Sequence, residues 1–87
     1  MSGSTPAAEA ERVIVDLLSP VIGRNIASAS TKGYLARLKS ATVDAHQAEQ
    51  LVGWIAPGLK VFVGEAKTAQ VVGEIRIALT SLIGGAS

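Results

Sequence analysis

The stretch EAKTAQVVGEIRIALTSLI, residues Glu65–Ile83, is the one around which this 87-residue chain is organised. At 100° per residue its large apolar side chains fall on one arc, while most of its polar side chains lie elsewhere. That spacing predicts an amphipathic helix that begins after Gly64 and ends at Gly84-Gly85. The residues on the apolar arc are Val71, Val72, Ile75, Leu79, Leu82 and Ile83, with Thr68 as the polar exception. Such a helix cannot bury its apolar face alone, so the rest of the chain must form the opposing wall.

Helical spacing also recurs before this stretch, which predicts a compact all-α bundle of four or five short helices. Thr5-Pro6 is a suitable helix start, with Thr5 as N-cap and Pro6 at the first helical position. Ser19-Pro20 interrupts the first apolar run, so the helix either kinks there or ends, and a second helix begins at Pro20. We expect that second helix to stop near Gly33, and a later helix to end at the turn signal Pro57-Gly58.

One competing fold stays open at this stage. Residues 59–63 (LKVFV) are rich in β-branched side chains, and Glu74–Thr80 alternates apolar and polar residues at period two. Residues 59–63 and 71–80 could therefore form a C-terminal hairpin, which would make the chain α+β. The helical template fits a much longer stretch than the strand template, so the all-α fold is favoured.

The length of the chain allows one domain. We expect residues 1–5 to be a disordered lead-in, residues 6–84 to form the helical domain, and residues 85–87 to be a tail. The composition is 48% hydrophobic and 17% charged, whereas an average domain is about 25% charged. A small domain has a large surface to keep in water, so this low charge suggests that a partner, a second copy or a membrane covers apolar surface.

Several features bear on the compartment. The chain has no cysteine, which excludes a disulfide framework and fits a reducing environment. The N-terminal residues MSGSTPAAEAE lack the basic and apolar regions of a secretory signal, and no run approaches the roughly 20 apolar residues of a membrane span. We therefore expect a soluble, cytoplasmic protein.

Few residues in the chain could carry catalysis. The single histidine, His46, would have to serve any serine nucleophile as its base, and no Gly-x-Ser-x-Gly elbow presents such a serine. His46 and Glu49 share a helix face, but two ligands do not complete a metal site. The glycines are scattered rather than clustered as a phosphate cradle requires. The sequence predicts no enzyme activity, no metal and no cofactor.

The charged residues point instead to a protein partner. Between Asp16 and Asp44 the chain carries four basic residues and no acidic one, whereas the preceding segment is acidic. A net charge of +1 and 3% aromatic residues argue against nucleic acid, and a contact with the acidic first helix of another copy fits better. A solvated face with no partner is the alternative. The predicted partner-binding residues are Arg24, Lys32, Arg37, Lys39, Glu9, Glu11, Asp16 and Trp54.

Trp54 and Phe62 flank the turn signal Pro57-Gly58 in the most apolar stretch of the chain. We expect both side chains to fill the core. If Trp54 is exposed instead, it becomes the natural anchor of a protein interface, because aromatic side chains dominate interface hot spots.

Two resemblances bear on function. The run Leu18–Gly23 (LSPVIG), followed by Ala27 and Ala29, resembles small helical domains appended to bacterial kinases and regulators. The size and charge layout resemble small bacterial adaptors of the death-fold or effector-associated kind, which pair with their own kind. These resemblances imply a signalling adaptor, and we assign no family from them.

The sequence therefore favours a non-catalytic helical module that acts by self-association or homotypic pairing with another helical domain. The first alternative is an amphipathic protein of the membrane surface. A small nucleic-acid-binding protein that uses residues 24–39 is the less favoured one.

Overall fold

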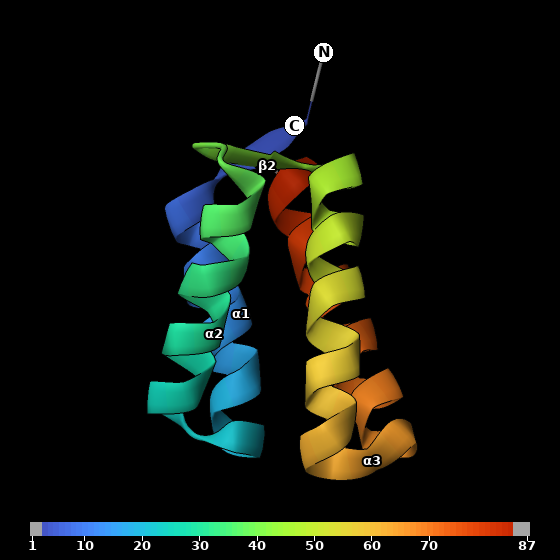
Figure 1. Ribbon diagram of the computed structural model, residues 1–87. Coiled ribbons are helices and arrows are strands. Elements are labelled where there is room, and N and C mark those ends of the chain that lie inside the picture. Colours follow the sequence, from blue (N-terminus) through green and yellow to red (C-terminus); the bar gives the residue numbers. More distant parts are fainter. Residues whose placement is uncertain (1–2, 85–87) are drawn as a thin grey trace.

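The computed structural model describes residues 3–84, which form two short strands and three helices (Figure 1). In chain order these are β1 (Ser4–Pro6), α1 (Ala7–Ile22), α2 (Arg24–Leu38), β2 (Thr42–Asp44) and α3 (Ala45–Gly84). The mostly helical, compact fold predicted from the sequence is confirmed. Within the described residues there are three helices rather than the predicted four or five. The helix ends predicted near Gly33 and at Pro57-Gly58 do not occur, because both positions lie inside helices. Residues 1–2 of the predicted lead-in, and the predicted tail 85–87, lie outside the described residues.

The helix α3 consists of two segments that meet at Gly64. The backbone there is non-helical (φ 84°, ψ 173°), a conformation that glycine adopts and other residues rarely do. The outgoing segment (residues 45–63) runs away from the strands, and the returning segment (residues 65–84) comes back toward them (Figure 1). Thr68 Oγ1 donates a hydrogen bond to the Gly64 carbonyl at 2.7 Å, which ties the first turn of the returning segment to the kink.

The returning segment is the amphipathic helix that the sequence predicts. Its buried residues lie on the predicted arc, and Leu82 and Ile83 continue that arc as partly buried residues. The opposing wall comes from α1 and the outgoing segment, which contribute the fully buried Ile14, Leu18 and Leu51. The buried residues of the returning segment are Thr68, Val71, Val72, Ile75 and Leu79. Among the described residues, the fully buried large side chains of this core are aliphatic.

The alternative α+β fold with a C-terminal hairpin is wrong. Residues 59–63 and 71–80 are helical, and within 71–80 the buried Val71, Ile75 and Leu79 recur at helical spacing. The two strands that do form lie elsewhere in the chain: β1 pairs with β2 in an antiparallel ribbon, with Thr5 opposite Val43. Each strand has three residues, too few for a period-two pattern to stand out in the sequence.

Thr5 and Pro6 belong to this ribbon and do not open α1 as predicted. Thr5, which the sequence places in a disordered lead-in as an N-cap, is 4% exposed and lies in β1. The helix begins at Ala7, whose backbone N–H donates to the Ala41 carbonyl at 2.8 Å. The backbone of Pro6 (φ −57°, ψ 142°) is extended, which suits the end of a strand.

The first two helices also differ from their predicted bounds. α1 continues through Pro20 and ends at Ile22, so the second helix does not begin at Pro20. The connection is Gly23, whose φ of 88° favours glycine because it has no Cβ. α2 then runs past Gly33, where the sequence predicts its end, and stops at Leu38.

Pro57-Gly58, predicted as a turn, lies inside α3. A proline in a helix interior loses a backbone hydrogen bond and clashes with the preceding turn, at a cost of about 3 kcal/mol. Ile55 and Leu59 on either side are 2% and 4% exposed, and burial of each such side chain contributes about 1.5–3 kcal/mol. Packing against the core therefore outweighs the local turn signal.

The helices form two layers, with α2 and the outgoing segment in front of α1 and the returning segment in Figure 1. α2 is the least anchored of them, because Ala27 and Thr31 are its buried residues. Thr31 Oγ1 is buried and has no hydrogen-bond partner among the described residues. Within residues 3–84, none of the helices combines the length and the apolarity that a membrane crossing needs.

Candidate protein-interaction face

The aromatic side chains gather at one seam of the bundle. The chain has one tyrosine, one tryptophan and one phenylalanine, and all three lie where α2 meets the outgoing segment. The rings of Tyr34 and Trp54 are 6.5 Å apart between centroids and tilted by 32°, a separation at which aromatic pairs attract. Phe62 and Tyr34 line the same small pocket. The prediction that Phe62 fills the core is wrong, and Trp54 is only partly buried.

Arg37 extends this seam with a cation. Its guanidinium carbon lies 4.4 Å from the centroid of the Trp54 ring, within the range of a cation–π contact. α2 and the outgoing segment are thus joined at this point by an arginine, a tyrosine and a tryptophan. Two of these, Arg37 and Trp54, are residues that the sequence predicts to bind a partner.

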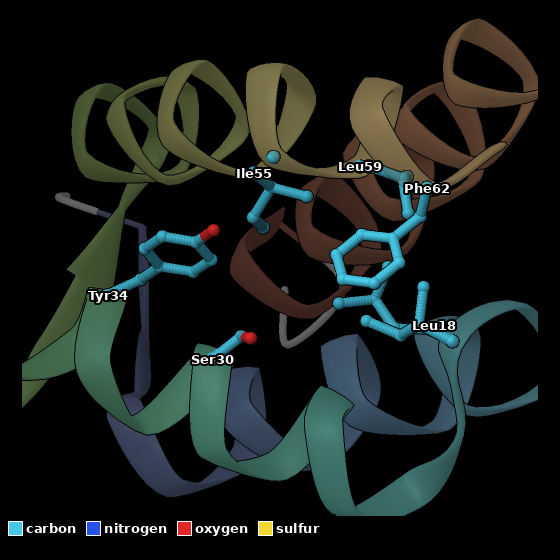
Figure 2. A pocket seen from close by; sticks show the side chains of 8 residues that line it. Leu18, Ser30, Tyr34, Ile55, Leu59 and Phe62 are labelled. Atoms are coloured by element: carbon cyan, nitrogen blue, oxygen red, sulfur yellow. The ribbon is translucent and has the colours of Figure 1, made fainter. Parts of the chain in front are cut away.

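The pocket at the seam is shallow and apolar (Figure 2). Tyr34 and Ser30 point from α2 toward Ile55 and Phe62 on the outgoing segment, and Leu18 of α1 lies at its deeper end (Figure 2). Its volume is about 40 Å³, enough for one or two waters and too small for a metabolite.

Gly58 shapes the middle of the seam. A Cβ at this position would lie 3.2 Å from Tyr34 Oη, so the absence of a side chain lets the tyrosine approach the α3 backbone. The aromatic contact between the two helices therefore depends on a glycine inside α3, at the position where the sequence suggested a turn.

Large apolar side chains next to the pocket face solvent. Val61 is 86% exposed, Phe62 60% and Ile26 46%. Ile26, Ser30 and Tyr34 are spaced four residues apart, so they share one side of α2, and Trp54, Gly58 and Phe62 do the same on the outgoing segment. We call this surface the aromatic face: Ile26, Ser30, Tyr34 and Arg37 from α2, with Trp54, Gly58, Val61 and Phe62 from the outgoing segment.

The aromatic face is poor in charge. Arg37 is its single charged residue, and the other charged residues of its two helices lie elsewhere around each helix. Glu49 and Lys60 lie about 120–140° around the helix from Trp54, and Lys32 lies about 140° from Arg37. Lys39 follows α2 as its C-cap, in a left-handed conformation. Glu49 is also engaged by Arg76 of the returning segment, whose Nε and Nη2 donate to the carboxylate at 2.9 and 3.0 Å.

The predicted basic segment is therefore divided between faces. Arg37 lies at the aromatic face, whereas Lys32 lies on the nearly opposite side of α2 and Lys39 follows the end of the helix. Arg24 lies toward α1, where its Nη2 is 3.4 Å from Asp16 Oδ1. The four basic residues form no continuous stripe, which reduces their value as a nucleic-acid surface.

The predicted acidic helix is partly neutralised by its own neighbours. Glu9 accepts a hydrogen bond from Arg12 at 2.6 Å, which together with its charge raises the pKa of Arg12. Glu11, Asp16 and Arg24 line one shallow hollow between α1 and α2, with a volume of about 360 Å³. Solvent screens exposed pairs of this kind, so they contribute little to the stability of the fold, but they offset part of the negative charge of α1.

Tyr34, Phe62, Val61 and Ile26 are members of the aromatic face that the sequence did not single out as binding residues. The four-residue spacing of Trp54, Gly58 and Phe62 places them on one side of a helix. The sequence does not reveal this, because it predicts that the helix ends at Pro57-Gly58. No cluster of three histidine, cysteine or acidic residues is present in the part of the chain that the structure describes, and His46 is exposed.

Comparison with known proteins finds no family model, no curated protein and no solved structure that matches this chain. The features that bear on function are therefore those of the aromatic face itself: its aromatic side chains, its exposed aliphatic side chains and its single cation.

Proposed function

We propose that this protein is a non-catalytic helical interaction module that works by self-association or homotypic pairing. The observation that carries the proposal is the composition of the aromatic face. Tyrosine, tryptophan, phenylalanine and arginine are enriched in protein interfaces, and lysine and acidic residues are depleted. The aromatic face contains one of each enriched residue, Tyr34, Trp54, Phe62 and Arg37, and neither lysine nor carboxylate. An adaptor role in signalling is the biological use to which such a module is suited.

The difference between the side chains of the core and those of the aromatic face supports this proposal. Large aromatic side chains usually dominate the energetics of a core, yet the fully buried large side chains here are aliphatic, with Ile14, Leu18 and Leu51 among them. The aromatic residues are thus placed where a partner could bury them. Val61 and Phe62 each offer up to about 1.5–3 kcal/mol on full burial, which makes them candidates for hot spots at the centre of an interface.

The charged residues have a secondary part in this proposal. Glu9, Asp16 and Arg24 make ion pairs within the chain, so a contact between the acidic helix of one copy and the basic segment of another must compete with these pairs. Surface charges chiefly steer association and set its rate. We therefore expect an assembly that is held by apolar contacts and changes little with salt.

A membrane surface is the second candidate, favoured by one specific arrangement. Val61 and Phe62 are strongly exposed and follow Lys60 at the end of the bundle that carries the Gly64 kink. Exposed apolar side chains beside a lysine are typical of segments that rest on anionic lipid. Sedimentation with anionic vesicles separates this candidate from self-association, since a lipid-binding chain would co-sediment and a self-pairing one would remain in solution.

Light scattering after size exclusion tests the main proposal with a matched pair of variants. Val61→Ser and Ile77→Ser each remove an exposed aliphatic side chain from α3 (86% and 72% exposed), but Ile77 lies on the returning segment outside the aromatic face. We expect Val61→Ser to shift the chain toward monomer and Ile77→Ser to leave its mass unchanged. Equal effects of the two variants would contradict the assignment of the interface.

A further inference from the structure

We propose that the partner of the aromatic face is the aromatic face of a second copy, packed antiparallel about a two-fold axis level with Gly58. This inference rests on the proposed function, self-association, and adds the surface and the geometry. The axis lies between the two faces, perpendicular to the helices, so each outgoing segment packs on its counterpart with opposite direction.

The distribution of side chains along the face selects this geometry. Trp54 and Phe62 lie four residues before and after Gly58, or about 6 Å above and below it along the helix. A two-fold axis at Gly58 therefore brings Trp54 of one copy to the height of Phe62 in the other. The Phe62 and Val61 side chains, 60% and 86% exposed, then meet the aromatic end of the partner face rather than solvent.

The charge on the face leads to the same choice. The guanidinium of Arg37 lies over Trp54, so in the antiparallel pair it faces the partner's apolar end, where the Phe62 ring can accept a cation. The two guanidinium groups are then about 12 Å apart along the bundle, beyond the Debye length of about 8 Å at physiological ionic strength. A parallel pair would instead place the two cations at the same height, where they repel.

The middle of the face permits close approach of two copies. Gly58 has no side chain, and the Tyr34 hydroxyl lies against it, 3.2 Å from where a Cβ would be; Ser30, which lines the same pocket, is small. The neighbouring surface of α2 carries Ala29 and Gly33, both exposed and spaced four residues apart. Small residues at this spacing let helix backbones come together, so Tyr34 is the one large side chain near the centre of the antiparallel pair, and it lies down against Gly58.

A charge exchange tests the geometry directly. Val61→Lys places a lysine opposite the partner's Arg37, and we expect it to weaken self-association at least tenfold. Arg37→Glu removes the cation from the same contact and should also weaken it. In an equimolar mixture, the carboxylate introduced in one variant meets the ammonium introduced in the other at one end of the pair, and the native contact remains at the other end. We therefore expect the mixture to form a heterodimer more stable than either variant alone.

The remaining outcomes would each overturn the inference. If the wild-type chain self-associates and Val61→Lys does so equally well, the proposed function stands but the aromatic face is not the interface. Equal rescue of Arg37→Glu by wild type and by Val61→Lys would establish the parallel pair instead, because both of these chains keep the Arg37 that meets the new carboxylate in that geometry. A wild-type chain that stays monomeric would refute the proposed function itself, and binding of that monomer to anionic vesicles through Val61 would assign the face to lipid. Ile77→Lys is the matched control for an added surface lysine, and far-UV circular dichroism verifies that each variant is folded.

Discussion

The guanidinium carbon of Arg37 lies 4.4 Å from the centre of the Trp54 ring, and this contact joins α2 to the outgoing segment. The contact matters for the fold as well as for the surface, because α2 buries only Ala27 and Thr31 among its fifteen residues. Because α2 buries so few residues, its position in the bundle depends on contacts at its edge. The same residues that could bind a partner therefore hold the aromatic face in shape.

Replacement of Arg37 by alanine tests that contact. An exposed cation–π pair contributes about 0.5–1 kcal/mol, so we expect Arg37→Ala to lower the free energy of unfolding by this amount. Trp54 is the single tryptophan, so its fluorescence reports the site without interference, and its emission should shift toward longer wavelength as the ring becomes more exposed. Lys32→Ala on the far side of α2 is the control. Unchanged emission in Arg37→Ala at a dilution where the chain is monomeric would refute the contact.

Two of the buried threonines, Thr31 and Thr68, should respond in opposite directions to the same substitution. Thr31 Oγ1 has no partner among the described residues, and an unsatisfied buried hydroxyl costs about 1–3 kcal/mol. Thr68 Oγ1 donates to the Gly64 carbonyl at 2.7 Å, and loss of such a bond costs about 0.5–1.5 kcal/mol. We expect Thr31→Val to stabilise the chain and Thr68→Val to destabilise it in chemical denaturation. A loss of stability in Thr31→Val would show that its hydroxyl is satisfied in solution.

Two glycines of α3 should respond to alanine in opposite directions. Gly64 has a φ of 84°, and a side chain in such a region costs about 1–3 kcal/mol. Gly53 is helical, exposed and free of neighbours within 4 Å of an added Cβ, so Gly53→Ala should stabilise the helix by up to about 1 kcal/mol. Thermal unfolding of the two variants measures both. A stable Gly64→Ala variant would mean that the two segments of α3 do not meet in the bend seen here.

The ion pair between Glu49 and Arg76 joins the two segments of α3 at their exposed side. Its two hydrogen bonds, at 2.9 and 3.0 Å, give the bidentate geometry in which arginine binds carboxylate best. Both side chains are about half exposed, so we expect a coupling energy of about 0.2–1 kcal/mol. A double-mutant cycle with Glu49→Gln and Arg76→Gln measures this energy, which should fall at high salt. A coupling energy that salt leaves unchanged would be inconsistent with an exposed pair.

The helical core was accessible from the sequence because its signal is local. The apolar arc of Val71, Ile75 and Leu79 repeats at the helical period, and these residues are the ones the structure buries. The turn expected at Pro57-Gly58 was wrong because that signal is also local, whereas the burial of Ile55 and Leu59 that overrides it depends on distant parts of the chain.

The candidate site was only partly accessible for the same reason. Trp54 and Arg37 could be proposed as binding residues from their types, but their mutual contact joins residues from two different helices. The β-ribbon pairs Thr5 with Val43, which are separated by two helices, and no short-range pattern links them. The sequence predicts Phe62 in the core because aromatic residues in an apolar stretch usually lie there. Its exposure follows from its position at the edge of the seam between two helices.

Sedimentation equilibrium of the wild-type chain, over a wide range of protein concentration and at low and high salt, tests whether the aromatic face pairs with itself. We predict a mass that rises with concentration from 8.9 kDa to twice that value and no further, because a two-fold pair of aromatic faces closes on itself. Salt should change the dissociation constant little. A chain that remains at the monomer mass at every concentration would contradict self-association. Continued growth beyond the dimer at low salt alone would contradict the apolar face as the interface and would indicate the charge-complementary contact instead.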